Sequence, residues 1–129
     1  MGCLGPELIT LRKRFSFEKA RRSGVCFHCE LFLLQAYSGG EHDASPERVS
    51  CGITVSRKVG SAIHRNRAKR RLRVALRTVL VSMGCPGQAY VVVARRRVEA
   101  CSWAMLLQKL RTGVLSVNER LSASKRSVS

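Results

Sequence analysis

One long segment, from about Ala62 to Met83, constrains the fold most, because its apolar side chains recur with the period of an α-helix. These side chains lie three or four residues apart: Leu72, Ala75, Leu76, Val79, Leu80 and Met83. Gly60 and Ser61 precede the segment, and Gly84 and Pro86 end it. A helix with one apolar face must bury that face against another layer. The segment therefore predicts a helix of about six turns packed on a sheet or on other helices.

Apolar, β-branched segments on both sides of this helix predict a small sheet. Residues 25–37 predict one strand, residues 38–47 a hairpin loop, and residues 48–56 a returning strand. Residues 88–94 form a nearly continuous apolar run between charged residues, which is typical of a central buried strand.

Two more helices are expected. Ser16 is a candidate cap for a short helix that ends near Arg22, and Ser102 is a candidate cap for the last helix. In that last helix the apolar residues recur at helical spacing: Trp103, Leu106, Leu107, Leu110 and Val114. The predicted fold class is α/β, an α+β two-layer sandwich in which helices pack on a small sheet.

The chain has 129 residues, about the length of one domain. Its hydrophobic content of 45% excludes a wholly disordered chain. We expect a flexible leader at residues 1–10, a single domain at residues 11–116 and a flexible polar tail at residues 117–129.

The charge balance indicates a polyanionic partner. Lys and Arg number 24 against 8 Asp and Glu, a formal net charge of +16 at pH 7. Such a field attracts nucleic acid or an anionic membrane surface and is unusual for metabolic enzymes. No apolar run approaches the roughly 18 residues of a spanning helix, and the N-terminus lacks a signal-peptide pattern. We therefore expect a cytoplasmic protein with a nucleic-acid partner and no membrane.

The basic residues concentrate on the long predicted helix. No Asp or Glu occurs between Glu47 and Glu99. Four bases, Arg65, Lys69, Arg73 and Arg77, lie four residues apart and so form one stripe about 18 Å long. Like charges at this spacing each cost roughly 0.2–0.5 kcal/mol in the free protein. A merely solvated helix face would mix in acids, so the stripe favours binding to phosphates.

Asn66 and Phe17 each have a functional and a structural interpretation, and the sequence spacing does not distinguish the two interpretations. Asn66 lies between two Arg and offers a donor and an acceptor to a base or sugar, or else makes a local backbone hydrogen bond. Phe17 lies among basic residues, where it stacks on single-stranded RNA or else anchors the first helix in the core.

Metal and nucleophile sites are poorly supported. Cys26 and Cys29 form a CxxC pair, but residues three apart on a strand point to opposite faces, and no second pair follows. The six cysteines are interpreted as free thiols. No carboxylate pair for catalytic magnesium is found, so we expect no catalytic residue and no metal site in the protein.

The segment from Gly52 to Arg73, GITVSRKVGSAIHRNRAKRRLR, resembles the signature of the bacterial ribonuclease P protein component family. That signature contains the block VSKKVG-x-AV-x-RNR-x-KR-x-x-R. Matches to it are Val55 through Gly60, Ala62, Ile63, Arg65, Asn66, Arg67, Lys69, Arg70 and Arg73. The resemblance extends over about residues 11–115, including the basic opening at residues 11–24 and the late strand at residues 88–97.

The resemblance implies an α-β-β-β-α-β-α fold, similar to a ribosomal-protein domain, with a left-handed crossover. It implies a non-catalytic subunit that binds ribonuclease P RNA about one-to-one, contacts precursor tRNA, and needs no protein partner. The RNA removes the 5′ leader, so the enzyme is an endoribonuclease of tRNA 5′ maturation. The protein binds no cofactor, and the magnesium is required by the RNA.

The resemblance also implies site residues. The RNA-binding motif comprises Arg57, Lys58, Arg65, Asn66, Arg67, Lys69, Arg70 and Arg73. The cleft for the precursor leader comprises Phe17, Arg21, Gln35, Asn66, Lys69 and Arg73. Arg21 and Gln35 stand where many relatives have aromatic residues, so leader binding here is expected to depend less on stacking.

Two other classes of protein remain as alternatives. A ribosomal or other structural RNA-binding protein would share the basic surface but would not stimulate precursor tRNA cleavage. A DNA-binding helix would need mixed polar residues for base readout, whereas this helix face is nearly all cationic.

Overall fold

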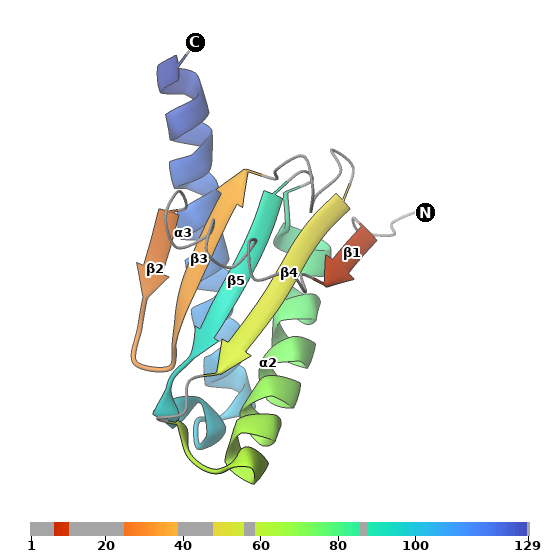
Figure 1. Ribbon diagram of the computed structural model, residues 1–129. Coiled ribbons are helices and arrows are strands. Elements are labelled where there is room, and N and C mark those ends of the chain that lie inside the picture. The colour runs from red at the N-terminus through yellow and green to blue at the C-terminus, as the bar shows by residue number, and fades with distance from the viewer. Residues whose placement is uncertain (1–6, 11–24, 39–47, 56–58, 86–87, 129) are drawn as a thin grey trace.

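The computed structural model describes residues 7–10, 25–38, 48–55, 59–85 and 88–128 (Figure 1). Five strands form one sheet in the order β1-β4-β5-β3-β2. The strands are β1 (Glu7–Thr10), β2 (Val25–His28), β3 (Phe32–Ser38), β4 (Arg48–Val55) and β5 (Gln88–Ala94). The helices are α2 (Ala62–Met83), the short 3-10 helix η2 (Arg96–Glu99) and α3 (Trp103–Val128).

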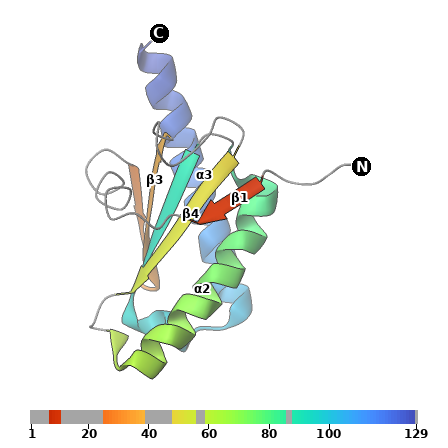
Figure 2. The same ribbon diagram turned by 45° about the vertical axis from the view of Figure 1, so that its right-hand side comes forward.

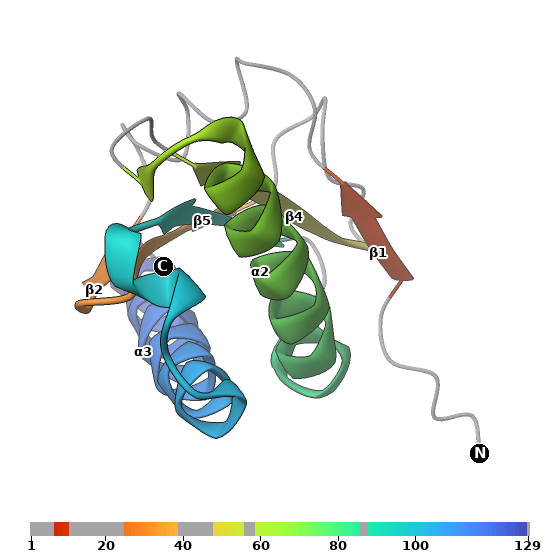
Figure 3. The same ribbon diagram turned by 90° about the horizontal axis from the view of Figure 1, so that it is seen from below.

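Both long helices cover the same face of the sheet, as the view from below shows (Figure 3). The helix-facing side chains of β3 and β5 alternate with outward ones, so Phe32, Leu34, Tyr90 and Val92 join the helices in one core. Opposite α2, this core continues into Val49 and Cys51 of β4. The two-layer α+β fold class is therefore confirmed.

The connection from β4 through α2 to β5 is a left-handed crossover. β4 and β5 are adjacent and parallel, so they need a crossover, and α2 supplies it. In Figure 1 both strands run downward, α2 returns behind the sheet, and β5 lies to the left of β4. Almost all such connections are right-handed, so this topology is a distinctive feature of the fold.

The predicted helix at residues 62–83 and the predicted central strand at residues 88–94 are confirmed with the same bounds. β5 lies between β4 and β3, and six of its seven residues are buried. The predicted hairpin between residues 25–37 and 48–56 is wrong, because β5 inserts between those two strands. Instead, residues 25–37 themselves fold back, and β2 pairs with β3 antiparallel.

The structure describes secondary structure within both ends that were expected to be flexible. Within the expected leader, Glu7–Thr10 forms β1, which pairs in parallel with β4 from Arg48 to Cys51. Within the expected tail, α3 continues to Val128, because Val117 and Leu121 extend its buried apolar stripe. The helix expected from Ser16 to Arg22 lies outside the described residues.

One buried tyrosine connects the end of α2, the start of β5 and α3. The Tyr90 hydroxyl accepts a hydrogen bond from the Cys85 backbone N–H at 3.0 Å and lies 2.5 Å from Asn118 Oδ1. The Asn118 side-chain amide in turn donates to the Met83 carbonyl oxygen at 2.9 Å. Burial raises the pKa of Tyr90 well above its usual value. This network fixes the end of α2, and hence the direction of the whole basic helix.

Candidate nucleic-acid interface

An open pocket of about 370 Å³ lies between the end of β4 and the first turns of α2. Its lining consists of Ile53, Thr54 and Val55 from β4, and of Ala62, Arg65, Asn66 and Lys69 from α2. β1 pairs with β4 only as far as Cys51, so the pocket lies past the end of β1. Figure 2 shows β1 beside the C-terminal half of α2, while the N-terminal half reaches beyond the lower part of the sheet.

The pocket is electropositive for two independent reasons. Arg65 and Lys69 contribute full positive charges. The N-terminus of α2 adds a partial positive charge, and its first turn has no acidic residue to offset it. Within the described residues, the Arg65 Nε atom is buried without a hydrogen-bond partner, although such donors are normally paired. The pocket therefore has a positive field, which suits an anionic ligand.

The predicted stripe of Arg65, Lys69, Arg73 and Arg77 lies along the flank of α2 beside β4. The pocket places Arg65 and Lys69 against β4. Burial raises the pKa of the Cys51 thiol on β4, and the nearby charges of Arg77 and Arg73 oppose that rise. Arg65 and Lys69 thus lie against β4, and Arg73 and Arg77 follow near Cys51 as the stripe turns gradually toward the outer side of α2. We call these four bases the β4-flank stripe.

The other motif residues divide into two groups. Arg67 and Arg70 are exposed on the side of α2 opposite its buried residues, so they face a different direction from the pocket. Arg57, Lys58, Phe17 and Arg21 lie outside the described residues. The structure therefore brings Arg65, Asn66 and Lys69 together in one pocket, with Arg73 next along the stripe.

Gln35, which was expected in the leader cleft, does not reach this pocket. It is only 6% exposed and points away from the helices, opposite the neighbouring core residues Leu34 and Ala36. Its register partner on β5 is Val91, so β5 separates it from β4. At about 4.8 Å per strand, Gln35 lies roughly 10 Å from β4.

Two residues near the motif were missed by the sequence analysis. Thr54 is exposed and contributes to the pocket lining, although its side chain lies on the face of β4 opposite Ile53 and Val55, which pack against the core. Arg71 is part of the basic run, but its guanidinium donates to the Val98 carbonyl oxygen at 3.1 Å. Arg71 therefore joins α2 to η2, which sequence spacing alone does not show.

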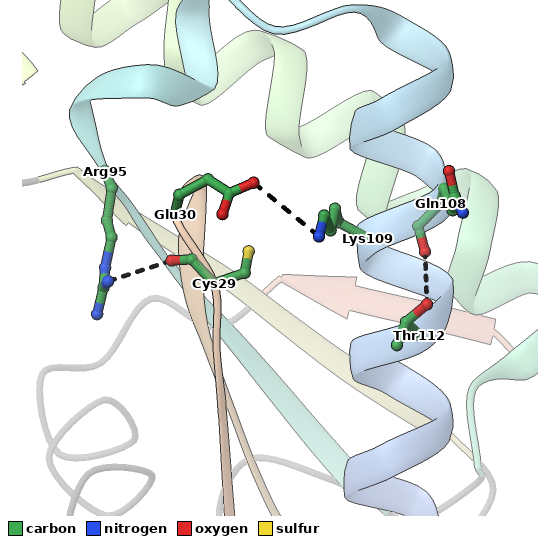
Figure 4. Close-up of polar contacts among 6 residues, drawn as sticks. All are labelled: Cys29, Glu30, Arg95, Gln108, Lys109 and Thr112. Atoms are coloured by element: carbon green, nitrogen blue, oxygen red, sulfur yellow. Dashed lines mark hydrogen bonds and ion pairs between the residues drawn. The ribbon is translucent and has the colours of Figure 1, made fainter.

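Basic residues at the β2–β3 turn also have structural partners (Figure 4). Arg95 donates to the Cys29 carbonyl oxygen at 3.1 Å, and Lys109 of α3 lies 3.9 Å from Glu30. Cys29 packs against the helix-side core, whereas Cys26 pairs with Gln35 and shares its face. In the part of the chain that the structure describes, no three His, Cys, Asp or Glu residues form a metal-binding group.

Comparison with known proteins agrees with this architecture. A family model described as Ribonuclease P matches residues 6–118. The ribonuclease P protein component of Ruegeria pomeroyi is 45% identical over 96 residues, which are 72% of this chain and 72% of that protein.

No helix among the described residues is long and apolar enough to cross a membrane.

Solved structures show the same fold. The RNase P protein from Thermotoga maritima superposes with a TM-score of 0.63 at 28% identity, over 80% of this chain and 92% of that one. The Staphylococcus aureus RNase P protein gives a TM-score of 0.66 at 24% identity, over 84% and 94% of the two chains. Family model, relatives and fold agree, and the chain belongs to the ribonuclease P protein family as a protein component of ribonuclease P.

Proposed function

We propose that the chain binds ribonuclease P RNA through the basic residues of α2 and holds the single-stranded 5′ leader of precursor tRNA beside β4. The catalytic RNA then removes the leader to give the mature 5′ end of the tRNA. In this proposal one copy of the protein binds one RNA in the cytoplasm. The protein contributes affinity and orientation, and it contributes no catalytic residue.

The pocket between β4 and α2 is the main support for this proposal. Its lining includes Asn66 and Lys69, which match both the RNA-binding motif and the leader cleft of the family. Asn66 adds an amide that can both donate and accept. Such groups bind a sugar, a phosphate or a base edge without requiring a stacking aromatic side chain.

The opposite direction of Arg67 and Arg70 supports a two-sided role for α2. A helix with cations on two sides can contact two RNA segments at once, one along β4 and one on its outer side. We assign the outer side to the catalytic RNA and the pocket to the leader. Magnesium belongs to the RNA in this scheme, and the protein lowers the concentration needed by neutralising phosphates.

The deciding experiment is 5′ processing of a precursor tRNA by a bacterial ribonuclease P RNA at low magnesium, with and without the full chain. We expect strong stimulation at a one-to-one ratio. Absence of stimulation by a folded protein that still binds RNA would contradict the proposal and favour a general structural RNA-binding role.

Separate variants distinguish the two sides of α2. Replacing Lys69 with Gln should weaken binding of precursor tRNA more than of mature tRNA, because only the precursor has a leader. Replacing Arg67 and Arg70 with Gln should weaken binding of the catalytic RNA itself. Arg111→Gln on α3 is the matched control, since Arg111 is exposed and α3 packs beside β2 and β3 rather than β4.

A further inference from the structure

The β4-flank stripe continues beyond the family motif. The motif ends at Arg73, and the next member of the stripe, Arg77, lies one helical turn further on, at about 6 Å. Both residues act on the same thiol of β4, Cys51, so they occupy the same flank. That thiol belongs to the β4 residue that pairs with Thr10, where β1 ends.

Among the residues that the structure describes, Arg77 has no hydrogen-bond or ion-pair partner that would explain its position. Other arginines of the described residues are used within the fold: Arg71 donates to Val98, Arg95 to Cys29 and Arg120 to Cys26, each at a carbonyl oxygen. Arg77 is exposed and makes no hydrogen bond or ion pair with another described residue. Arg73, its neighbour on the stripe, is likewise exposed and unbonded within the described part of the chain.

The elements β4, α2 and β5 supply no acidic residue to Arg77, and the acid on the neighbouring strand β1 is Glu7, which is in register with Arg48. No acidic residue occurs anywhere from residue 48 to residue 98, which covers all of β4, α2 and β5. Arg73 and Arg77 are four residues apart and repel each other in the free protein. A bound phosphate would remove that repulsion, and a guanidinium suits phosphate through its paired donors.

From this arrangement we propose that Arg77 is a further RNA-binding residue, which extends the phosphate-binding track from the pocket by one helical turn along β4. The proposal rests on the function proposed above, because the track begins at the leader pocket. The ligand is one RNA phosphodiester. It comes either from a part of the leader far from the cleavage site or from the catalytic RNA, and the experiment separates these sources.

The test uses holoenzyme assembled from ribonuclease P RNA and the full chain, with Arg77→Gln, Arg73→Gln and Arg111→Gln compared at equal net charge. Gln keeps the helix, since its helix propensity is close to that of Arg. Binding is measured for precursor tRNAs with leaders of graded length, and for the catalytic RNA alone, across a salt series. We expect Arg77→Gln to weaken binding about twofold to fivefold and to reduce the salt slope by about 0.7, the value for one single-strand phosphate.

Each outcome decides the proposal. A loss that appears only with longer leaders assigns the phosphate to the leader and supports the track. A loss in affinity for the catalytic RNA, independent of leader length, assigns the phosphate to that RNA and also supports the track. If Arg77→Gln behaves as Arg111→Gln while Arg73→Gln weakens binding, the track ends at Arg73 and only the extension is wrong. If Arg73→Gln also has no effect, there is no phosphate-binding track beyond the pocket, and the leader pocket itself is tested separately by Lys69→Gln.

Discussion

The arginines of the basic helix α2 differ in whether their side chains have hydrogen-bond partners within the described residues. Arg71 and Arg65 lie six positions apart on α2, yet Arg71 is bonded to Val98 of η2 while the Nε atom of Arg65 is buried without a partner. A buried donor left unpaired costs about 1–3 kcal/mol relative to a paired one. The Nε donor of Arg65 therefore remains unpaired within the described residues, whereas the guanidinium of Arg71 is hydrogen-bonded within the fold.

The first prediction concerns the Nε donor of Arg65. Arg65→Lys keeps the charge but loses the Nε donor and the planar fork. We expect RNA affinity to fall about threefold to tenfold, as for loss of one hydrogen bond, while the salt slope stays nearly unchanged. Filter binding over a salt series measures both quantities. Unchanged affinity in Arg65→Lys would mean that Arg65 acts only as a point charge, which Lys supplies equally well.

The start of α2 depends on one glycine. Gly60 has φ of +138°, a conformation that residues with a Cβ rarely adopt, and a Cβ there would lie 3.3 Å from His64 Cβ. We expect Gly60→Ala to lower the free energy of unfolding by about 1–3 kcal/mol, as measured by urea denaturation. Ser61→Ala is the control, because the Ser61 side chain makes no capping hydrogen bond. Equal losses in the two variants would contradict a role for the backbone conformation of Gly60.

Among the secondary-structure elements, sequence analysis succeeded where the signal was local and failed where pairing joins distant segments. α2 and β5 were predicted because periodicity over 22 residues and a nearly continuous apolar run at residues 88–94 leave few alternatives. β1 was missed, since four residues show no pattern and their partner strand begins at Arg48. The grouping of Asn66 with Lys69 followed from helical spacing, whereas the place of Gln35 depended on strand order, which spacing does not encode.

The contact of α3 with the sheet predicts the sign of the change in stability for Gly113→Ala. Gly113 of α3 is buried, and a Cβ there would lie 2.8 Å from Phe27 Cδ2 and 3.0 Å from Leu34 Cδ2. In an isolated helix Gly→Ala stabilises by about 1 kcal/mol, but here overpacking should destabilise the protein by about 1–3 kcal/mol. Thermal and urea unfolding measure the change. Adding Phe27→Leu should recover part of the loss, and a stabilised Gly113→Ala single variant would show that α3 approaches the sheet less closely.

For the molecule as a whole, the basic residues of α2 and the packing contacts of α3 lie in separate regions. α2 presents its bases along β4, on the side away from α3, while α3 packs against α2, β2 and β3. The network of Tyr90, Asn118 and Met83 ties the C-terminal end of α2 to α3. The direction of the basic helix α2 therefore depends on residues of α3 that lie far from the pocket.

The last prediction concerns the end of the domain, which the sequence analysis placed at residue 116. Ending the chain there would remove Asn118 from the Tyr90 network, Val117 and Leu121 from the core, and the hydrogen bond from Arg120 to the Cys26 carbonyl oxygen. Loss of two buried aliphatic side chains costs about 2–5 kcal/mol each, a large part of the 5–15 kcal/mol that is typical of a domain. We expect the chain of residues 1–116 to be largely unfolded by circular dichroism at 37 °C. A chain of residues 1–122, which keeps all four residues, should unfold at nearly the temperature of the full chain. Equal stability of the two truncated chains would mean that α3 beyond residue 116 adds nothing to the fold, and the domain boundary expected from the sequence would then be correct.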